Sequence, residues 1–380
     1  MNSMNELEDI FEYRRSTPPL GIERAIGELS DKPIILYGAG AFGAENFTLL
    51  KKYGVTPFAF LDKNAKPNSE KMGIPVYHPD DDNLSRSLRE NCSVLISITI
   101  PSRIMTGIKN DLRNWGYNDC TAVQSVTARQ ILFDDTSEEN PDDDYFELNK
   151  EKIKHVFGCM ADEESRETYI SSIRAHLLRK YEDAFETASP VQYFDAGVPL
   201  EKGLSHFVDC GAYNGDTLSG ALRYCDSIET YTAFEPIMSN FAALSLAVDE
   251  QQERVSNAYL FPCGLADRSG YARFTAAASS SAITKNDTGD ILPLVRMDDV
   301  IKNAPVSFLK MDIEGAELIA LRGAENIIKK QSPDLAISVY HYVNHYWDIP
   351  FYLSQINPKY RFYLRAHTAA TLESVLYCCE

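Results

Sequence analysis

Short apolar runs alternate with longer amphipathic stretches along most of the chain, and this alternation predicts an α/β fold. In the C-terminal half, five apolar runs separated by helical spacings predict the parallel strands of a doubly wound sheet. These runs are residues 206–209, 230–234, 258–262, 306–310 and 335–339. Two later runs, 360–367 and 373–379, are joined by a short polar segment and predict an antiparallel hairpin.

A smaller α/β unit is predicted ahead of this sheet. An apolar run at residues 33–37 leads into a turn with Gly38, Gly40 and Gly43 in the GxGxxG spacing, and Asp62 ends the next apolar run. This order predicts a nucleotide-type site, because glycines admit a phosphate to the backbone and the acid can accept from a ribose. The unit resembles the nucleotide-sugar-binding N-terminal domains of some sugar acyltransferases. The alternative is that the glycines only close a tight turn.

The pattern of breaks in the chain predicts four parts. Residues 1–30 form a helical lead-in interrupted by two prolines, and residues 31–132 form the small Rossmann-like unit. Residues 133–190 combine an acidic linker with a helical connector, whose apolar spacing breaks near residues 161–162. The large sheet takes up residues 191–380.

One stretch organises the C-terminal half, HFVDCGAYNGD at residues 206–216. An apolar strand ends here at Asp209 and enters a turn that Gly211 and Gly215 keep free of side chains. A ligand can therefore lie against backbone N–H groups at the start of the next helix. Glu235 ends the following strand, where a carboxylate can accept from both hydroxyls of a ribose.

The order and spacing of these motifs resemble those of S-adenosylmethionine-dependent methyltransferases, and the segments themselves resemble the FkbM family. The matching segments are VDCGAYNGDT at 208–217, FEP at 234–236, MDD at 297–299, LKMDIEGAE at 309–317, RGAENII at 322–328 and PDLAISVYH at 333–341. The resemblance implies an enzyme with S-adenosyl-L-methionine as its cofactor. It also implies a seven-stranded Rossmann-like sheet that ends in an antiparallel hairpin.

The resemblance further implies which residues hold the cofactor. Asp209 is expected to orient its ammonium group, the amides after Gly211 to bind its carboxylate, and Glu235 to bind its ribose hydroxyls. Asp267 is expected to accept from the adenine amino group, and Leu265 to pack on the adenine ring. The full expected set is Asp209, Gly211, Ala212, Tyr213, Asn214, Gly215, Glu235, Pro236, Leu265 and Asp267.

Methyl transfer to an alcohol requires a general base within hydrogen-bond reach of the hydroxyl. Asp312 and Glu314 follow a central strand, at the edge where open α/β sheets bind ligands. His341 follows the next strand, should come close to Asp312, and is the preferred base. His341 and His345 with either acid form an alternative divalent-metal site, but we expect no metal, since the zinc motif's glutamate is missing.

The chain carries a formal net charge of −18, and its Lys and Arg residues form no cluster with interleaved aromatics. Such a charge repels a phosphate backbone, so nucleic acid and anionic membranes are not expected partners. The polar start at residues 1–16 lacks the features of a secretory signal, and the apolar run 94–100 is too short to span a bilayer. We therefore expect a cytoplasmic protein.

The resulting hypothesis is an enzyme that methylates a hydroxyl of a small-molecule acceptor by in-line transfer, the acceptor being a sugar, a sugar nucleotide or a secondary metabolite. A homo-oligomer is compatible with the sequence. The alternative is a non-catalytic nucleotide or sugar-nucleotide binding protein on a methyltransferase scaffold. An NAD-dependent oxidoreductase is disfavoured, because no second half of a dinucleotide domain follows the GAGAFG turn.

Overall fold

The computed structural model describes residues 4–16, 32–98, 102–122, 144–178, 191–276, 281–284, 290–368 and 373–380. These residues fall into two compact units. Unit 1 comprises Met1–Lys150, Ile170–Ala188 and Ala366–Leu372, and unit 2 comprises Glu151–Tyr169, Ser189–Arg365 and Glu373–Glu380. The boundaries expected after residues 30, 132 and 190 fall in or beside stretches outside the described residues, so they stay predictions.

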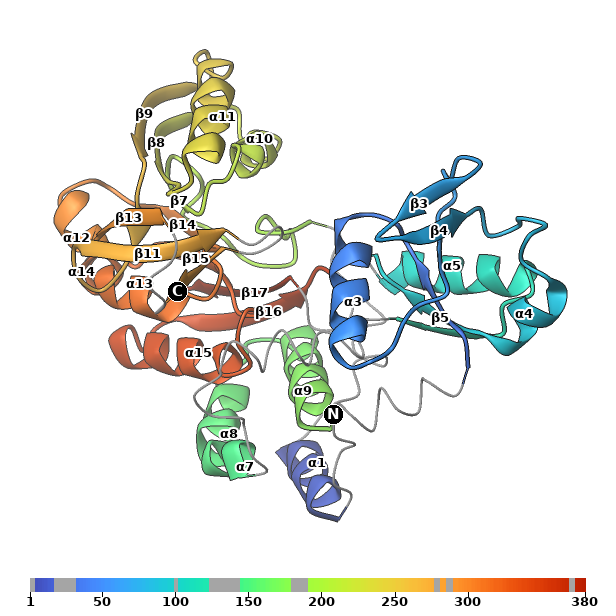
Figure 1. Cartoon of the computed structure of the whole chain (residues 1–380). Helices are drawn as coiled ribbons and strands as arrows, with labels where there is room; N and C mark the ends of the chain where they lie inside the picture. Colours follow the sequence, from blue (N-terminus) through green and yellow to red (C-terminus); the bar gives the residue numbers. More distant parts are fainter. Residues whose placement is uncertain are drawn as a thin grey trace. The chain divides into compact units, whose positions relative to one another are not determined.

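The described part of unit 1 holds a mixed six-stranded sheet in the order β3-β4-β2-β1-β5-β6 (Figure 1). Its strands are β1 (Ile34–Tyr37), β2 (Ala59–Leu61), β3 (Ser69–Lys71), β4 (Ile74–Tyr77), β5 (Ser93–Ile96) and β6 (Asp119–Ala122). All neighbouring strands pair in parallel except β3 and β4, which are antiparallel. The α/β sheet predicted ahead of the large sheet is therefore confirmed.

Helices pack against both faces of this sheet, because successive residues of a strand point to opposite sides. The helices are α3 (Ala41–Lys52), α4 (Arg86–Asn91) and α5 (Ser102–Asn114). Leu36 of β1 belongs to the same buried cluster as Leu50 of α3. Its neighbour Ile35 belongs to a second cluster, which contains Leu112 of α5. A fully buried strand such as β1 therefore needs apolar residues at every position.

Helices occupy the described parts of the lead-in and of the connector, while the bounds of these two parts stay predictions. α1 (Met4–Ser16) buries Leu7, Ile10 and Phe11, the stripe that the sequence predicts. The connector consists of α7 (Asp144–Leu148), α8 (Lys150–Cys159) and α9 (Glu163–Leu178). The break between α8 and α9 falls at the expected residues 161–162. The acidic linker itself lies outside the described residues, apart from its last few positions.

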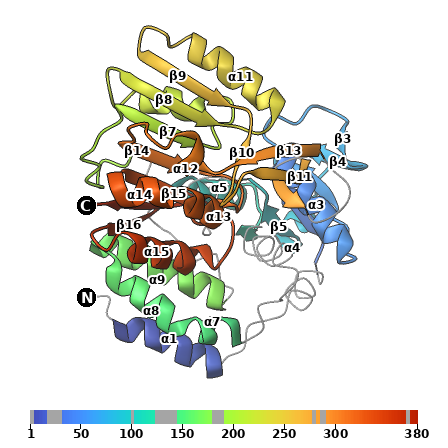
Figure 2. The ribbon, with the colours of Figure 1, turned by 90° about the vertical axis from the view of Figure 1, so that its left-hand side faces the viewer.

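Unit 2 is built on the predicted seven-stranded sheet, in the order β16-β17-β15-β14-β7-β8-β9. Its strands are β7 (His206–Cys210), β8 (Ile228–Phe234), β9 (Val255–Phe261), β14 (Phe308–Met311), β15 (Asp334–Ser338), β16 (Arg361–Ala366) and β17 (Ser374–Cys379). Strands β7, β8, β9, β14 and β15 run parallel, and Figure 2 shows them side by side. β17 is antiparallel to β15, which confirms the predicted antiparallel end of the sheet.

The helices of unit 2 follow these strands in the order of a doubly wound sheet. They are α10 (Asp216–Ala221), α11 (Met238–Asp249), α12 (Met297–Val300), α13 (Glu317–Gly323), α14 (Glu325–Gln331) and α15 (His345–Ile356). The chain reverses direction across the sheet between β7 and β14, because β8 lies on one side of β7 and β14 on the other. Such a reversal opens a crevice at the carboxyl ends of the strands, where ligands bind.

A second, smaller sheet in unit 2 was not foreseen from the apolar pattern. It consists of β10 (Gly264–Leu265), β11 (Gly270–Ala276), β12 (Ser281–Thr284) and β13 (Asp290–Val295), in the order β10-β13-β11-β12. One face of this sheet is open to solvent, where Tyr271 is 79% exposed and Ile291 60%. The opposite face contributes Leu265, Ala272 and Leu294 to a cavity wall.

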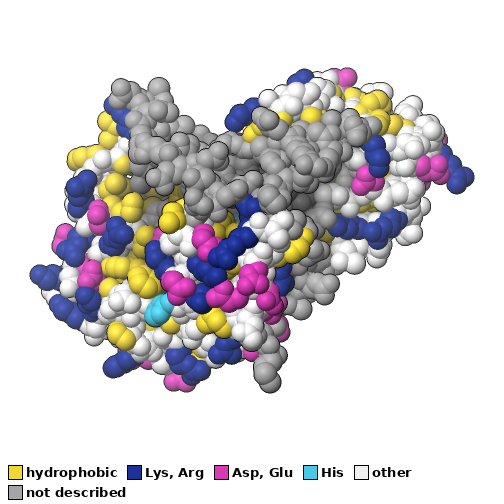
Figure 3. Space-filling model, turned by 90° about the horizontal axis from the view of Figure 1, so that it is seen from below, with side chains coloured by type: hydrophobic (Ala, Val, Ile, Leu, Met, Phe, Trp, Pro, Cys, Tyr) yellow, Lys and Arg dark blue, Asp and Glu magenta, His cyan; other side chains and the backbone are white. Residues whose placement is uncertain are grey.

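Among the described helices, none is long and apolar enough to cross a membrane. Figure 3 shows one face of the molecule, on which Lys and Arg side chains are interspersed with Asp and Glu side chains.

Candidate functional site

A cavity of about 860 Å³ opens in unit 2 at the carboxyl ends of four parallel strands. Gly211 follows β7, Glu235 follows β8, Asp312 follows β14, and Tyr340 lies two residues after β15, and all four line the cavity. A volume at the upper end of the usual range for ligand sites can hold a cofactor together with a second molecule. The cavity therefore lies where the sequence places the candidate site.

The turn after β7 packs against the turn after β14, and only glycine fits between them. Gly211 has a φ of +80°, and a Cβ at this position would overlap the carbonyl oxygen of Asp312. Gly215 has a φ of +86°, and its Cβ would approach Ala247 of α11 within 2.8 Å. A side chain at Gly211 would push the two turns apart, and one at Gly215 would displace α11, which explains the two glycines in the motif.

Glu235 joins the glycine turn to the start of the next helix. Its side chain is 5% exposed, and Oε2 accepts from the backbone N–H of Tyr213 at 3.0 Å. Oε1 accepts from the N–H of Ile237 at 2.9 Å. Burial raises the pKa of Glu235, and the two amides oppose that effect because they favour the charged form. Glu235 thus stabilises the turn while it lines the cavity.

Asp209 and Lys310 form a buried ion pair behind the glycine turn. Asp209 is 0% exposed and Lys310 2%, and Lys310 Nζ lies 3.2 Å from Asp209 Oδ1. Tyr231 donates to Asp209 Oδ2 at 2.9 Å, and Lys310 donates to the carbonyl oxygen of Gly211 at 2.7 Å. Burial acts to lower the pKa of Lys310, but Asp209 and Asp312 raise it above its ordinary value, so the ammonium stays charged.

The turn after β14 carries the acids of the KMDIEGAE motif. β14 ends at Met311, so Asp312 and Glu314 lie in the turn, and both line the cavity. Glu314 has a φ of +58°, and burial raises the pKa of its carboxyl group. Glu317 is fully buried, and its Oε1 accepts from the N–H of Ile313 at 2.9 Å, which fixes the turn.

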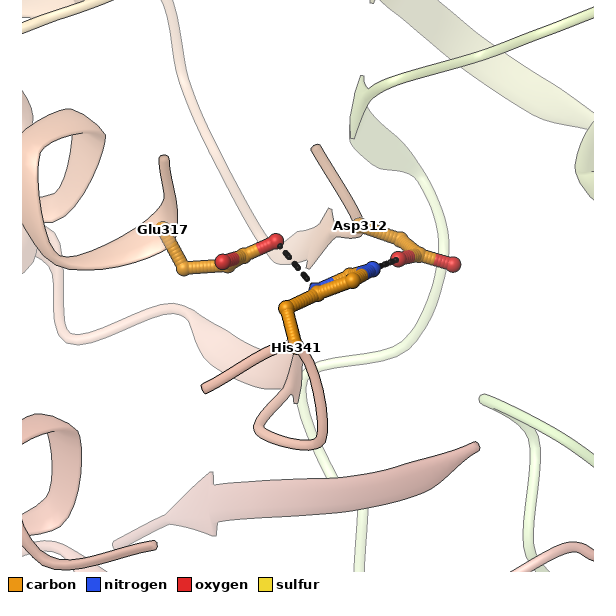
Figure 4. Close-up of side chains that lie close together, drawn as sticks. All are labelled: Asp312, Glu317 and His341. Carbon is orange, nitrogen blue, oxygen red and sulfur yellow. Dashed lines mark ion pairs between the residues drawn. The ribbon is translucent and has the colours of Figure 1, made fainter. Parts of the chain in front are cut away.

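His341 lies between Asp312 and Glu317 (Figure 4), and its approach to Asp312 is the one expected from the sequence. Its Nε2 is 3.4 Å from Asp312 Oδ1 and its Nδ1 is 3.0 Å from Glu317 Oε1. Burial acts to lower the pKa of His341, but Glu317 and the other two acids raise it to about 9. Burial acts to raise the pKa of Glu317, but His341 and His345 lower this pKa to about 2. The imidazole and the inner carboxylate therefore form an ion pair.

Two tyrosines at this site were missed by sequence reasoning. Tyr193 donates to Asp312 Oδ2 at 2.6 Å, and its ring lies 5.2 Å from Lys310 Nζ. Tyr340 donates to Asp312 Oδ1 at 3.5 Å. Tyr193 stands in the loop that leads into β7, and nothing in VQYFDAG distinguishes a cavity residue from an apolar loop residue. Tyr340 directly precedes His341, so its position just after β15 could have indicated a cavity residue.

The predicted residues divide into those that line the cavity and those behind its wall. The lining residues among them are Gly211, Tyr213, Glu235, Pro236, Leu265, Asp312 and Glu314. Among the described residues, the lining set does not include Asp209, Ala212, Asn214, Gly215, Asp267 or His341. The structure therefore brings together the glycine turn, the segment at Glu235 and the KMDIEGAE turn. Some of the predicted residues lie behind the residues that line the cavity.

The second predicted site lies in unit 1, in the turn between β1 and α3. Asp62 Oδ2 accepts from the N–H of Ala39 at 3.3 Å, and Lys71 Nζ donates to the carbonyl oxygen of Gly40 at 2.9 Å. A Cβ at Gly43 would overlap the carbonyl oxygen of Gly38, so packing is by itself a sufficient reason for a glycine at this position. Nucleotide binding by this turn stays a prediction.

Removal of the buried ammonium should destabilise unit 2. Lys310→Met leaves Asp209 charged, buried and without its cation, which costs about 3–5 kcal/mol of unfolding free energy. Lys310→Met combined with Asp209→Asn removes both charges and should restore most of this loss. Urea denaturation of both variants measures the difference. An unchanged unfolding midpoint in Lys310→Met would contradict this account of the pair.

The comparisons with known proteins agree with this geometry. Residues 209–365 match the family model described as the Methyltransferase FkbM domain. A solved structure of methyltransferase FkbM from Methylobacillus flagellatus KT is similar over 99% of both chains, with 22% identity and a TM-score of 0.69. Aeropyrum pernix fibrillarin, solved with natively bound S-adenosyl-L-methionine, covers 48% of this chain and 68% of its own, with 10% identity and a TM-score of 0.30.

No curated protein matches this chain. The family match begins at Asp209, near the end of β7, and includes the KMDIEGAE turn, His341 and most of the residues that line the cavity. The solved FkbM structure shows that the fold extends over the whole chain. Residues 209–365 therefore form a domain of the FkbM type, which is an S-adenosylmethionine-dependent methyltransferase domain.

Proposed function

We propose that this methyltransferase acts on a hydroxyl group of a neutral or cationic small acceptor, with a sugar ring as the most suitable class. The observation that supports an oxygen acceptor is the pair of acids, Asp312 and Glu314, in the cavity wall beside the glycine turn. An alcohol is a weak nucleophile at neutral pH, and a carboxylate within reach can take its proton as the new bond forms.

The cavity residues suit the cofactor that the family uses. S-adenosylmethionine supplies an activated methyl group when it is bound. Glu235 offers a carboxylate at the end of β8, the position that accepts ribose hydroxyls in nucleotide folds. Leu265, 4% exposed on the small sheet, offers an apolar surface for the adenine ring. Asp209 lies behind the wall, so we assign it to Lys310 and the turn instead of to direct contact.

Glu314 is our proposed general base. Its side chain is 44% exposed and lines the cavity, so an acceptor can reach it. Asp312 is less free, because Tyr193 donates to its Oδ2 at 2.6 Å. His341, the preferred base from the sequence, has a side chain that is 10% exposed and lies behind the two acids. Glu314 is thus the member of the expected catalytic set that an acceptor can reach most easily.

The charge of the cavity wall favours an acceptor without a phosphate. The acidic lining residues are Asp216, Glu235, Asp312, Glu314 and Glu373. The basic lining residue, Lys310, directs its ammonium toward Asp209 and the carbonyl oxygen of Gly211. Such a wall attracts the positively charged cofactor and repels anions. We therefore prefer a neutral sugar or amino sugar to the sugar nucleotide that the sequence also suggested.

Cofactor binding should depend on Glu235. Because the carboxylate both faces the cavity and accepts from the turn amides, Glu235→Ala should weaken the affinity for S-adenosylhomocysteine by at least tenfold. Calorimetric titration measures this affinity without an acceptor. Glu253→Ala, at an exposed position outside the cavity lining, is the matched control and should bind like the wild type. Equal affinities of the Glu235 variant and the wild type would remove Glu235 from the cofactor site.

Turnover should depend on Glu314. Glu314→Gln keeps the size of the side chain but cannot take a proton, so kcat should fall by about 10²–10⁴-fold while the affinity for S-adenosylhomocysteine stays within about threefold. Isotope-labelled methyl transfer to a screened sugar acceptor gives kcat. The base would have to be sought elsewhere if Glu314→Gln retained wild-type turnover.

A further inference from the structure

The cluster in Figure 4 brings three side chains of metal-ligating type together. Asp312, Glu317 and His341 each offer one donor atom, and these atoms all lie within 4.8 Å of one another. The three residues come from the turn after β14, the start of α13 and the segment after β15. Ligands from separate elements of a rigid sheet can be held in place before an ion arrives, which favours binding.

Donor atoms in this cluster are buried without hydrogen-bond partners. Among the described residues, neither ring nitrogen of His341 has a hydrogen-bond partner, and neither does Oε2 of Glu317. Nδ1 of His341 lies 3.0 Å from Glu317 Oε1. The two atoms are close enough for an ion pair, but their geometry does not meet that of a hydrogen bond. Buried polar atoms without partners are rare in folded proteins and require an explanation.

A bound cation would give a partner to one ring nitrogen of His341 and to Oε2 of Glu317. His341 would then offer a lone pair to the ion in place of an N–H to a carboxylate, and Oε2 of Glu317 would gain a positive partner. Neighbouring ligands of an ion with bond lengths of about 2.1 Å lie roughly 3.0–3.4 Å apart. The contacts of His341 with Asp312 and Glu317 measure 3.4 and 3.0 Å but involve different ring nitrogens, Nε2 and Nδ1. One carboxylate must therefore move toward the nitrogen that binds the ion, within a cluster whose donor atoms lie within 4.8 Å of one another.

We propose that Asp312, Glu317 and His341 form a binding site for a divalent transition-metal ion at the inner wall of the cavity. One imidazole and two carboxylates suit Mn²⁺ and its neighbours in the first transition row better than Ca²⁺, which prefers six to eight oxygen ligands. His345 supports the site from behind, because its Nδ1 lies 3.4 Å from Glu317 Oε2. His345 would therefore orient the carboxylate of Glu317.

The ion would lie next to the proposed base and to the space for the acceptor. Asp312 lines the cavity, and Glu314 on the same turn contacts His341 Nε2 at 3.5 Å. A cation at this point lowers the pKa of a hydroxyl group beside it and offsets part of the negative charge of the wall. Glu317 and His341, which do not line the cavity, would thus serve to bind the ion.

Mn²⁺ binding to the full chain tests the proposal. Mn²⁺ is the probe because the chain has eight cysteines, whose thiols prefer softer ions. The loss of the free Mn²⁺ signal in electron paramagnetic resonance gives the stoichiometry and affinity, without S-adenosylmethionine or an acceptor. We expect one ion per chain in the wild type. Asp312→Asn and His341→Gln should each weaken the affinity at least tenfold.

The matched control is Glu373→Gln, which removes an acid from the same cavity wall but outside the cluster. It should bind Mn²⁺ within about twofold of the wild type, and a loss equal to that of Asp312→Asn would overturn the assignment. Thermal unfolding checks that each variant is folded. A folded wild type without saturable Mn²⁺ binding would also overturn it. Because the measurement omits the cofactor, its failure would leave the proposed methylation and its Glu314 test unaffected.

Discussion

The site depends on one contact between the two central strands of the large sheet. Asp209 and Lys310 are register partners on β7 and β14, and their charged groups meet 3.2 Å apart where both strands end. Lys310 also donates to the carbonyl oxygen of Gly211, so the ion pair fixes the glycine turn as well. Because both charges are buried, neither can relax into water if the strands move. The pair therefore sets the spacing between the cofactor turn and the acidic turn.

Around this contact, the sheet gathers more negative than positive charge. Asp312 and Glu314 follow β14, Glu235 follows β8, and Glu317 is fully buried behind them. Backbone amides donate to Glu235 and Glu317, and His341 lowers the pKa of Glu317. The negative charge of the cavity wall attracts a positively charged cofactor, and it is the basis of our proposal that the acceptor carries no phosphate.

Much of this arrangement could be predicted from the sequence, because it depends on residues near the ends of apolar strands. The approach of His341 to Asp312 followed from the parallel order of β14 and β15 alone. The position of Tyr193 could not be predicted, because a loop residue has no periodicity to place it. The burial of Asp209 behind Lys310 was also missed, since the direction of a side chain at a strand end depends on where the strand stops.

The central claim is that the enzyme, through its acid-lined cavity, methylates an acceptor that carries no phosphate group. The most direct measurement compares pairs of acceptors that differ only in charge, each sugar as a neutral glycoside and as its phosphate ester. The formation of S-adenosylhomocysteine gives kcat/KM for both members of a pair. We predict that the neutral member is methylated at least about tenfold more efficiently, since each added negative charge meets the acidic wall. More efficient methylation of the phosphate ester would contradict the account.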